Sequence, residues 1–338
     1  MKIPVNLPQN SYTVTVERGA LKKADQIFRL NRKVLIVTDS GVPAQYAQTV
    51  AALCKEAVVV TVPQGESSKS LATFEHLLGV MLENRFTRTD CVVAVGGGVV
   101  GDLAGFVAAS FMRGVDFYNA PTTVLSQVDS AVGGKVAVNL NGIKNCVGAF
   151  YQPKAVLIDP VVLETLPQRQ IANGLAEAVK MAITFDADLF ARFETENILQ
   201  NIDDIIAASV KAKAAVVEQD EKEAGLRRVL NFGHTIGHGI EAAAGLERLY
   251  HGECVAIGML PMCEENLRPR VKAVLEKLGL PTAFDVDADI VWEALTHDKK
   301  LSGDTIAVIY APDAGRFEIK EMPLIHFKDA VISALKGM

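Results

Sequence analysis

Histidine and acidic residues in the second half of the chain have spacings that suit a metal site. His234, His238 and Glu241 follow one another at intervals of four and three residues, so a helix would present them on one face. Thr235 occupies the position where a zinc metalloprotease would carry its catalytic glutamate, which excludes that class. His251 adds another imidazole a short distance along the chain.

A carboxylate from elsewhere could complete this set. Glu177 and Lys180 share one face of an otherwise apolar helical stretch, where a glutamate belongs either to the rim of a core or to a metal. Two histidines and one carboxylate with an open position form a catalytic zinc set, but spacing alone does not bring Glu177 to the histidines. Gly233, Gly237 and Gly239 each cost about 1 kcal/mol inside a helix, so they predict the close approach of another element or a ligand.

A glycine-rich turn in the first half predicts a phosphate-binding loop. Gly96, Gly98 and Gly101 follow an apolar strand with the G-x-G-x-x-G spacing, at the start of a helix. The glycines allow a tight turn whose free N–H groups can face a pyrophosphate, and the alternative is a buried turn with no ligand. The turn comes after the third or fourth expected strand, whereas the usual dinucleotide fingerprint follows the first.

Polar residues near other strand ends could extend such a site. Asp39 ends an apolar strand, so it could either bind ribose hydroxyls or cap the following helix. Glu66 and Lys69 have the same ambiguity. The segment 121–135 mixes small hydroxyls and glycines with one carboxylate and one ammonium, and Lys144 and Asn145 follow it. This segment is either a capped irregular loop or the site of a bound anion.

The elements that must position these residues fall into two parts. Through the first part, short β-branched runs alternate with helical patterns, which indicates a parallel sheet covered on both faces. The expected strands are 11–16, 33–38, 57–62, 91–95 and 154–158, and the expected helices are 41–54, 70–84 and 101–111. The second part is mainly helical, with helices expected at 167–183, 187–201, 203–223, 234–244 and 269–278 and a hairpin of strands 305–310 and 316–319. We therefore expect an α/β domain at residues 1–159 and a mainly helical domain at residues 160–338.

Composition excludes several other classes of protein. The 338 residues carry a net charge of −6, which argues against a nucleic-acid-binding surface. The most apolar stretch, 91–112, is interrupted by glycines and Asp102, so no membrane span is expected, and the first residues show no signal core. The 5 cysteines form no CxxC pair. We expect reduced thiols and a cytoplasmic location.

Together these segments resemble the 3-dehydroquinate synthase family of sugar-phosphate cyclases. The resemblance covers nearly the whole chain and rests on motifs that occur in the same order. In the first half these are Gly96-Gly97-Gly98-Val99-Val100-Gly101-Asp102, Phe111-Met112-Arg113-Gly114, Pro121-Thr122-Thr123, Val128-Asp129-Ser130, Gly133-Gly134-Lys135, Lys144-Asn145 and Gly148-Ala149-Phe150-Tyr151-Gln152-Pro153. In the second half they are Leu175-Ala176-Glu177, Leu230-Asn231-Phe232-Gly233-His234, His251-Gly252-Glu253 and Asp298-Lys299-Lys300.

The resemblance implies an N-terminal Rossmann-like parallel-sheet NAD domain and a C-terminal helical domain for metal and substrate. It implies NAD binding by Asp39, Glu66, Lys69, Gly97, Gly98, Asp102, Thr122, Thr123, Asp129, Lys135, Lys144, Thr165 and Leu166. It implies zinc or cobalt on Glu177, His234 and His251. The implied substrate and catalytic residues are Asp129, Lys135, Asn145, Lys180, Lys213, Arg227, Asn231 and His238, with Arg113 reaching across a homodimer and Lys299 or Lys300 at the phosphate.

The implied activity is that of a phosphorus–oxygen lyase. It converts 3-deoxy-D-arabino-heptulosonate 7-phosphate to 3-dehydroquinate and phosphate by NAD-cycled oxidation, phosphate elimination, reduction and intramolecular aldol closure, a step of the shikimate route to aromatic amino acids. Either His238 or the substrate phosphate could act as the base. The alternatives are a related cyclase acting on sedoheptulose 7-phosphate or glucose 6-phosphate, a metal-dependent alcohol or glycerol dehydrogenase, and a non-catalytic dinucleotide-binding module.

Overall fold

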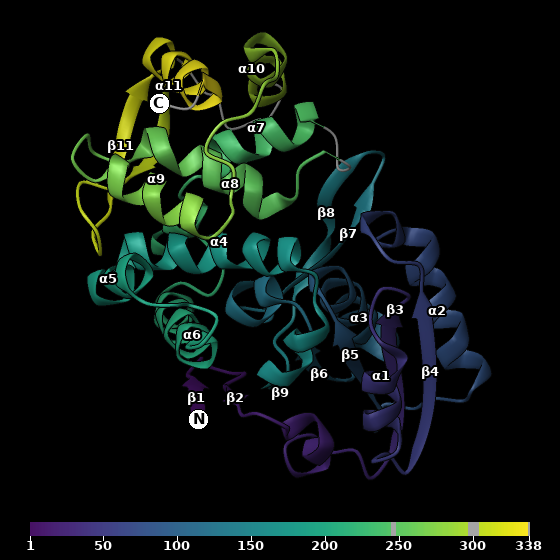
Figure 1. The fold of residues 1–338 in the computed structure, drawn as a ribbon. Helices are drawn as coiled ribbons and strands as arrows, with labels where there is room; N and C mark the ends of the chain where they lie inside the picture. The colour runs from purple at the N-terminus through teal and green to yellow at the C-terminus, as the bar shows by residue number, and fades with distance from the viewer. Residues whose placement is uncertain (245–247, 297–303, 337–338) are drawn as a thin grey trace. The chain divides into compact units, whose positions relative to one another are not determined.

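A computed structural model describes residues 1–244, 248–296 and 304–336 of the chain. Contacts divide it into two compact units. The first unit comprises Met1–Leu166 with Lys213–Lys222, and the second comprises Pro167–Ala212 with Glu223–Met338. The observed architecture, a parallel-sheet α/β part followed by a helical part, confirms the predicted fold class (Figure 1).

The first unit is built on a 7-stranded sheet of order β1-β2-β9-β6-β5-β3-β4. Only the β1–β2 pair is antiparallel. The strands are β1 (Lys2–Val5), β2 (Tyr12–Val16), β3 (Lys33–Asp39), β4 (Glu56–Val62), β5 (Cys91–Gly96), β6 (Asp116–Pro121) and β9 (Ala155–Ile158). Sequence patterns predicted β2, β3, β4, β5 and β9 to within one or two residues. They missed β1 and β6, and β6 contains aspartate, asparagine and proline, which are rare in strands.

Alternate residues of the central strands bury their side chains on opposite faces of this sheet. In β3, Val34 and Ile36 join one apolar cluster, whereas Leu35 and Val37 join the other. Helix α1 (Ala44–Ala51) and the short helix η1 (Ala20–Gln26) pack on the first face. Helices α2 (Leu71–Glu83) and α3 (Gly98–Ser110) pack on the second. Burial on both faces explains why β3 and β5 are continuous apolar runs.

A separate hairpin of strands β7 (Lys135–Leu140) and β8 (Ile143–Phe150) packs against α3. Gly105 allows this contact, because a Cβ there would collide with Val136 of β7. Short helices complete the unit: η2 (Glu66–Ser68), η3 (Phe111–Arg113), η4 (Ser126–Ser130) and η5 (Pro160–Thr165). The hairpin therefore begins at Lys135, where the segment 121–135 that was considered as an irregular loop ends.

The second unit is mainly helical and packs around α4 (Gln168–Phe185), which is buried along most of its length. Its other helices are α5 (Ala187–Thr195), the first part of α6 (Ile202–Gln219), η6 (Leu226–Asn231), α7 (His234–Ala244), α8 (His251–Met259), η7 (Leu260–Met262), α9 (Arg268–Lys277), α10 (Ala288–Thr296) and α11 (Leu324–Lys336). From Lys213 onwards, α6 belongs to the first unit. Strands β10 (Thr305–Tyr310) and β11 (Glu318–Pro323) form the expected antiparallel hairpin. The sequence patterns did not predict α8, α10 and α11.

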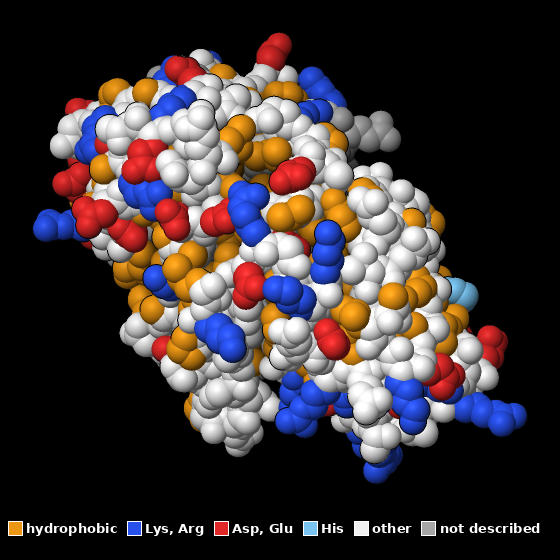
Figure 2. All heavy atoms as spheres, turned by 60° about the horizontal axis from the view of Figure 1, so that its bottom comes forward, with side chains coloured by type: hydrophobic (Ala, Val, Ile, Leu, Met, Phe, Trp, Pro, Cys, Tyr) orange, Lys and Arg blue, Asp and Glu red, His pale blue; other side chains and the backbone are white. Residues whose placement is uncertain are grey.

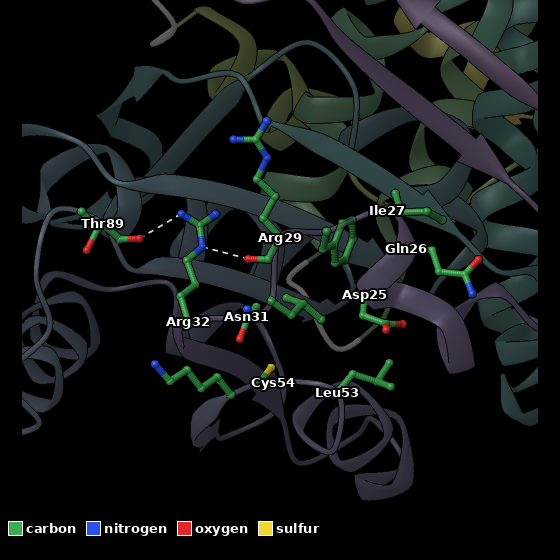
Figure 3. A pocket seen from close by; sticks show the side chains of 12 residues that line it. Asp25, Gln26, Ile27, Arg29, Asn31, Arg32, Leu53, Cys54 and Thr89 are labelled. Carbon is green, nitrogen blue, oxygen red and sulfur yellow. Dashed lines mark hydrogen bonds between the residues drawn. The ribbon is translucent and has the colours of Figure 1, made fainter.

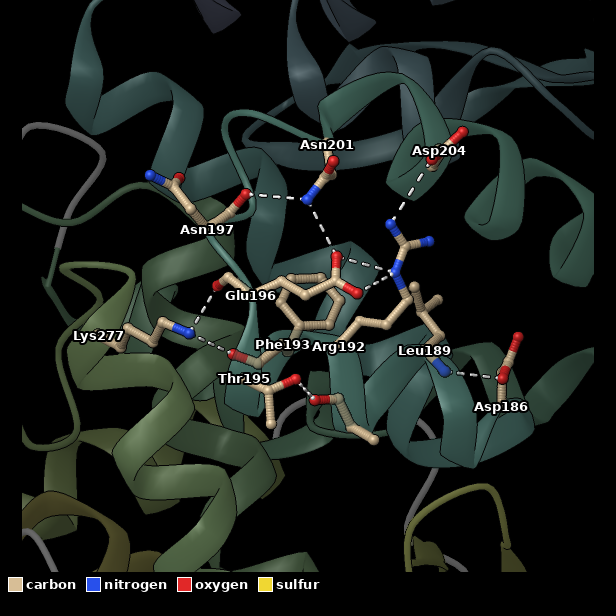
Figure 4. A network of polar contacts seen from close by, with 11 residues as sticks. Asp186, Leu189, Arg192, Phe193, Thr195, Glu196, Asn197, Asn201, Asp204 and Lys277 are labelled. Carbon is tan, nitrogen blue, oxygen red and sulfur yellow. Dashed lines mark hydrogen bonds and ion pairs between the residues drawn. The ribbon is translucent and has the colours of Figure 1, made fainter.

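Charged side chains fix the end of α5 (Figure 4). The Lys277 ammonium of α9 donates to the carbonyl oxygens of Phe193, Glu194 and Glu196, at 3.0, 3.2 and 2.7 Å. These are carbonyl groups that the end of a helix leaves without intrahelical partners. Arg192 pairs with Glu196 in the same network. The contacts of Lys277 link α9 to the end of α5 inside the second unit.

Two properties of the structure concern nucleic-acid binding and membrane insertion, which the composition argued against. On the face drawn in Figure 2, basic and acidic side chains are interspersed. Among the described helices, none has the length and apolar character needed to cross a membrane.

Candidate functional site

Glu177, His234 and His251 converge inside the second unit. Glu177 Oε1 lies 3.5 Å from Nε2 of His234 and 3.5 Å from Nε2 of His251. Glu177 is 1% exposed, and neither carboxylate oxygen has a hydrogen-bond partner of ordinary geometry among the described residues. A buried carboxylate needs a charged partner, and Lys180 Nζ lies 2.5 Å from its Oε2. Glu177 is thus held by two rings and one ammonium.

Both rings are oriented by contacts at their other nitrogen. Nδ1 of His234 lies 3.1 Å from the carbonyl oxygen of Phe232, and Nδ1 of His251 lies 3.1 Å from Oε2 of Glu241. If each Nδ1 donates its proton, each Nε2 presents its lone pair towards Glu177, as outer-shell partners arrange metal-binding histidines. Glu241, considered in the sequence as a possible ligand, is therefore a partner of His251.

The electrostatics of the cluster suit a cation. Burial lowers the pKa of His234 to about 3, so this ring is neutral. Burial also disfavours charge on His251, but the neighbouring carboxylates of Glu177 and Glu241 outweigh it and raise its pKa to about 9. Burial alone would raise the pKa of Glu177, yet Lys180 and the histidines hold it well below its usual range. A metal binding here would displace the proton of His251.

The distances agree with tetrahedral zinc coordination. Ligand atoms about 2.0–2.1 Å from zinc lie roughly 3.4 Å apart along a tetrahedral edge, and the two Glu177–histidine distances are 3.5 Å. His238 is exposed, and its ring nitrogen lies within 4.8 Å of those of His234 and His251. The three imidazoles therefore form one group. The set that fits a metal consists of Glu177, His234 and His251. The Glu177 carboxylate is buried, and each ring is oriented by a partner at its Nδ1.

Glycines bring the supporting helices together. A Cβ on Gly237 of α7 would lie 3.1 Å from the backbone of Cys254 and Val255 in α8, and a Cβ on Gly239 would meet Leu295 of α10. Gly233 adopts φ +74°, which favours glycine, and packs against α8. The glycines of this segment thus accommodate neighbouring helices.

Other predicted substrate residues of the second unit lie on α4 and η6. Lys180 follows Glu177 by one helical turn of α4 and is 1% exposed. Arg227 on η6 is also 1% exposed. The side chain of Asn231, at the end of η6, donates to Glu223 Oε1 at 3.1 Å.

In the first unit, the glycine-rich turn lies where the strand order of the sheet reverses. Strand β3 pairs with β4 on one side and β5 on the other, and their connecting helices α1 and α3 cover opposite faces. Asp39 ends β3 and Gly96 ends β5 at the same edge of the sheet. Such a switch point at the carboxyl ends of parallel strands is the usual ligand site of this architecture.

The loop after β6 packs directly on this turn. A Cβ on Gly97 would lie 3.1 Å from Thr123, and one on Gly98 would lie 3.1 Å from the Ser130 hydroxyl. Thr122 donates its N–H to Gly96 O at 2.9 Å. The helix α3 begins at Gly98, three residues earlier than expected, so its first free N–H groups belong to the glycine motif.

A polar network joins several predicted residues beside α3. The buried Lys69 ammonium contacts both Asp102 and Asn145. Asn139 of β7 donates to Glu66 Oε1 at 2.8 Å and accepts from the Asn145 N–H at 2.8 Å. Burial raises the pKa of Asp102 despite the opposing effect of Lys69. The network links Glu66, Lys69 and Asp102, predicted for the cofactor, to Asn145, predicted for the substrate.

Asp39 does not cap α1. Its Oδ1 accepts from the Gly41 N–H at 2.8 Å, whereas Pro43 is the residue before α1 and offers no side-chain cap. The capping alternative for Asp39 is therefore wrong. Thr165, which precedes Leu166, is exposed, and its hydroxyl lies 3.0 Å from that of Tyr46 on α1.

Asp129 and Lys213 form an ion pair within the first unit. Lys213 Nζ lies 3.0 Å from Asp129 Oδ1 and donates to its carbonyl oxygen at 2.7 Å. Lys213 comes from α6 but belongs to the segment that packs with the first unit. Lys135, at the start of β7, and Lys144, on β8, are exposed.

The last two predicted residues are Arg113 and Lys299. Arg113 is exposed on a turn in which Met112, Arg113 and Gly114 have φ values of 49°, 68° and 121°. Lys299, with its neighbour Lys300, lies outside the described residues.

A surface pocket of the first unit contains none of the predicted residues (Figure 3). Asp25, Gln26, Arg29, Asn31, Arg32, Leu53, Cys54 and Thr89 are among its lining residues. The Arg32 guanidinium is engaged by Asp116 at 2.8 Å and by the carbonyl oxygens of Arg29 and Thr89. We assign no chemistry to this pocket.

Comparison with known proteins decides between families. Residues 59–173 match the 3-dehydroquinate synthase N-terminal family model, and residues 174–301 match the C-terminal one. A 3-dehydroquinate synthase from Streptococcus thermophilus is 41% identical over 97% of this chain and 99% of the relative. The chain belongs to the 3-dehydroquinate synthase family.

Solved structures of related cyclases share the fold of this family member. A 2-deoxy-scyllo-inosose synthase complexed with carbaglucose-6-phosphate, NAD⁺ and Co²⁺ is 25% identical, with a TM-score of 0.91 over 100% of both chains. The 2-epi-5-epi-valiolone synthase from Streptomyces hygroscopicus, with NAD⁺ and Zn²⁺ bound, is 27% identical, with a TM-score of 0.87 over 98% of both chains. The higher identity to 3-dehydroquinate synthases favours that function over the other cyclases, the dehydrogenases and the non-catalytic module.

Sequence patterns missed one contributor to the site of this 3-dehydroquinate synthase family member. Asn139 links Glu66 to Asn145, and its only signal was a polar residue in the run Lys135–Leu140, which was not recognised as a strand. The contact depends on pairing between β7 and the residue after Lys69, which the local sequence does not show.

Proposed function

We propose that this chain is a 3-dehydroquinate synthase that converts 3-deoxy-D-arabino-heptulosonate 7-phosphate to 3-dehydroquinate and phosphate. The observation that carries the proposal is the buried Glu177 carboxylate 3.5 Å from two imidazole nitrogens, each oriented from behind, in a chain of this family. Two histidines and one carboxylate form a catalytic metal set with room for a substrate oxygen.

The proposed cofactors are NAD and a zinc or cobalt ion. The switch point of the sheet and the Lys69 network support NAD binding by the domain of residues 1–159. The segment Lys213–Lys222 belongs to the same compact unit as this domain. Residues 160–338 would hold the metal, on Glu177, His234 and His251. When bound, the metal supplies polarisation of a substrate oxygen, and NAD supplies reversible hydride transfer.

The chain's own residues would bind the anionic substrate and move its protons. Lys135, Lys180, Lys213 and Arg227 match a substrate that bears a carboxylate and a phosphate. Asp129, Asn145 and Asn231 would add hydrogen bonds to its hydroxyl groups. His238, an exposed imidazole beside the metal set, would hold and release protons. Lys299 is proposed for the phosphate.

We further propose a cytoplasmic homodimer. None of the five cysteines, all of them within the described residues, belongs to a disulfide, which supports a reducing compartment. The exposed position of Arg113 suits a residue that reaches a partner's substrate. Light scattering on the purified chain tests the dimer, and a monomer would remove the role given to Arg113.

The activity is tested by phosphate release from 3-deoxy-D-arabino-heptulosonate 7-phosphate with catalytic NAD. We expect phosphate in excess of NAD, lost on chelation and restored by zinc, with no net NADH. Release only from sedoheptulose 7-phosphate or glucose 6-phosphate would contradict the proposed substrate. Net NADH from glycerol would indicate a dehydrogenase instead.

Two variants separate the proposed roles. His251→Ala should lose metal and activity together, whereas Arg227→Ala should retain metal and NAD but raise KM. An Arg227→Ala enzyme with unchanged KM would refute the assignment of that residue.

A further inference from the structure

One side of α4 contacts the start of α8 through three successive pairs of residues. Arg169, Asn173 and Glu177 recur every four residues along α4, so they lie on one helical face. In order, they contact Glu253, Gly252 and His251, which are consecutive in α8. The last of these pairs belongs to the proposed metal set.

The first two pairs are well-formed hydrogen bonds. Arg169 donates from Nε to Glu253 Oε1 at 2.7 Å and from Nη2 to Oε2 at 2.8 Å. Asn173 Oδ1 accepts from the Gly252 N–H at 2.6 Å. A two-pronged arginine–carboxylate pair fixes direction as well as distance.

Glu253 also fixes where α8 begins. Its side chain is 7% exposed, and its Oε2 accepts from the Tyr250 N–H at 2.8 Å. The Arg169 guanidinium lies 4.3 Å from the centre of the Tyr250 ring and donates to the Arg248 carbonyl oxygen at 2.8 Å. One arginine of α4 therefore contacts Tyr250, immediately before His251, and Glu253, two residues after it.

We propose that Arg169 and Glu253 are positioning residues that set the place of the His251 imidazole relative to Glu177, and thereby the metal affinity of the enzyme. This inference rests on the proposed metal set. Neither residue contacts Glu177 or His251, so both act through the backbone at the start of α8. Metal sites tolerate ligand displacements of only about 0.5 Å, and loss of an outer partner typically lowers metal affinity about 10- to 100-fold.

The positive charge of Arg169, acting directly on a bound metal ion, would lower metal affinity, which is the opposite of the positioning effect. Arg169 precedes Glu177 by two helical turns, roughly 12 Å along the axis, which exceeds the screening length of about 8 Å in physiological salt. Removing its positive charge would, if anything, favour a cation. If removal of Arg169 lowers metal affinity, the cause is therefore a change in the position of the His251 imidazole.

The test compares Arg169→Gln with a matched control, Arg270→Gln. Arg270 pairs with Glu194 through Nε–Oε1 and Nη2–Oε2 contacts of 2.7 and 2.8 Å and lies 5.2 Å from the Phe190 ring. The two arginines belong to the same unit and are 49% and 45% exposed. Only Arg169 holds residues next to a proposed ligand.

Co²⁺ affinity is measured by competition with a chelator, with the visible absorption of bound Co²⁺ as a second readout. Urea unfolding without metal gives the stability of each variant. We expect Arg169→Gln to lower Co²⁺ affinity about tenfold and change its absorption, whereas Arg270→Gln should stay within twofold of the unmodified chain. Arg169→Lys keeps the positive charge but cannot make the two-pronged contact with Glu253, so it should also lower Co²⁺ affinity, and it provides the test if Arg169→Gln does not fold.

Equal Co²⁺ affinity in Arg169→Gln and Arg270→Gln would overturn the inference, even if both are destabilised, because the pair would then be merely structural. Glu177→Gln separates this failure from failure of the proposed function. If Glu177→Gln loses Co²⁺ while Arg169→Gln does not, only the positioning role is wrong. If Glu177→Gln binds Co²⁺ like the unmodified chain, the metal set itself is wrong and the inference falls with it.

Discussion

Alanine at position 252 would force helices α4 and α8 apart. The added carbon would lie 2.9 Å from both the carbonyl carbon and Oδ1 of Asn173 and closer still to its carbonyl oxygen, whereas ordinary contact begins at 3.4 Å. Because two of these atoms are backbone of a buried helix, they cannot rotate away. The contact with the carbonyl oxygen is the closest, so relief requires the helices to separate by more than about 1 Å.

This separation should cost stability and metal affinity together. Overpacking of this kind lowers the free energy of unfolding by about 3 kcal/mol. The higher helix propensity of alanine than of glycine raises it by about 1 kcal/mol. We expect Gly252→Ala to lower the free energy of unfolding by about 2 kcal/mol. Because His251 precedes Gly252, its imidazole should move relative to Glu177 by at least the tolerance of a metal site, so Co²⁺ affinity should fall tenfold or more.

Gly79→Ala is the matched control. Gly79 lies within α2, and a Cβ there would meet nothing within 4 Å. This variant should gain up to about 1 kcal/mol and retain Co²⁺ affinity. Urea unfolding without metal and chelator competition measure both quantities. If Gly252→Ala were as stable as Gly79→Ala, or bound Co²⁺ like the unmodified chain, the close packing of α4 on α8 would not position His251.

Three further predictions concern single side chains. Glu177→Gln should lower Co²⁺ affinity by at least 100-fold and abolish phosphate release, since it neutralises a buried ligand; unchanged binding in a chelator competition would reject Glu177 as a ligand. Lys69→Met should lower the free energy of unfolding by about 2–3 kcal/mol, because Asp102 loses its buried partner, and adding Asp102→Asn should recover part of it in urea unfolding. Since burial raises the pKa of Asp102, this loss should shrink as the pH falls and the carboxyl takes up a proton; a loss that stays constant with pH would contradict the pairing. Lys277→Met should cost about 1–2 kcal/mol, because three carbonyl oxygens at the end of α5 lose their donor, with thermal unfolding as the measurement and no change in Co²⁺ affinity expected.

Local patterns predicted the elements whose own residues carry a strong signal. The apolar runs of β3 and β5 and the helical periodicity of α7 were read correctly because burial of those strands and that helix follows from side-chain spacing. Helix α8 was missed because its two glycines lower helix propensity. They are present because α8 packs closely: a Cβ on Gly252 would collide with Asn173, and one on Gly258 with the backbone of Gly233.

Residue types and spacing alone showed which groups were available for chemistry, that three histidines fall within about 18 residues of one another, and that a glycine turn follows an apolar strand. Only the tertiary structure brought Glu177 to within 3.5 Å of His234 and His251, and Asn139 to Glu66. These contacts join residues distant in the chain. They depend on how closely the backbones of α4, α7 and α8 approach, which is a property of packed surfaces and is absent from any local run of residues.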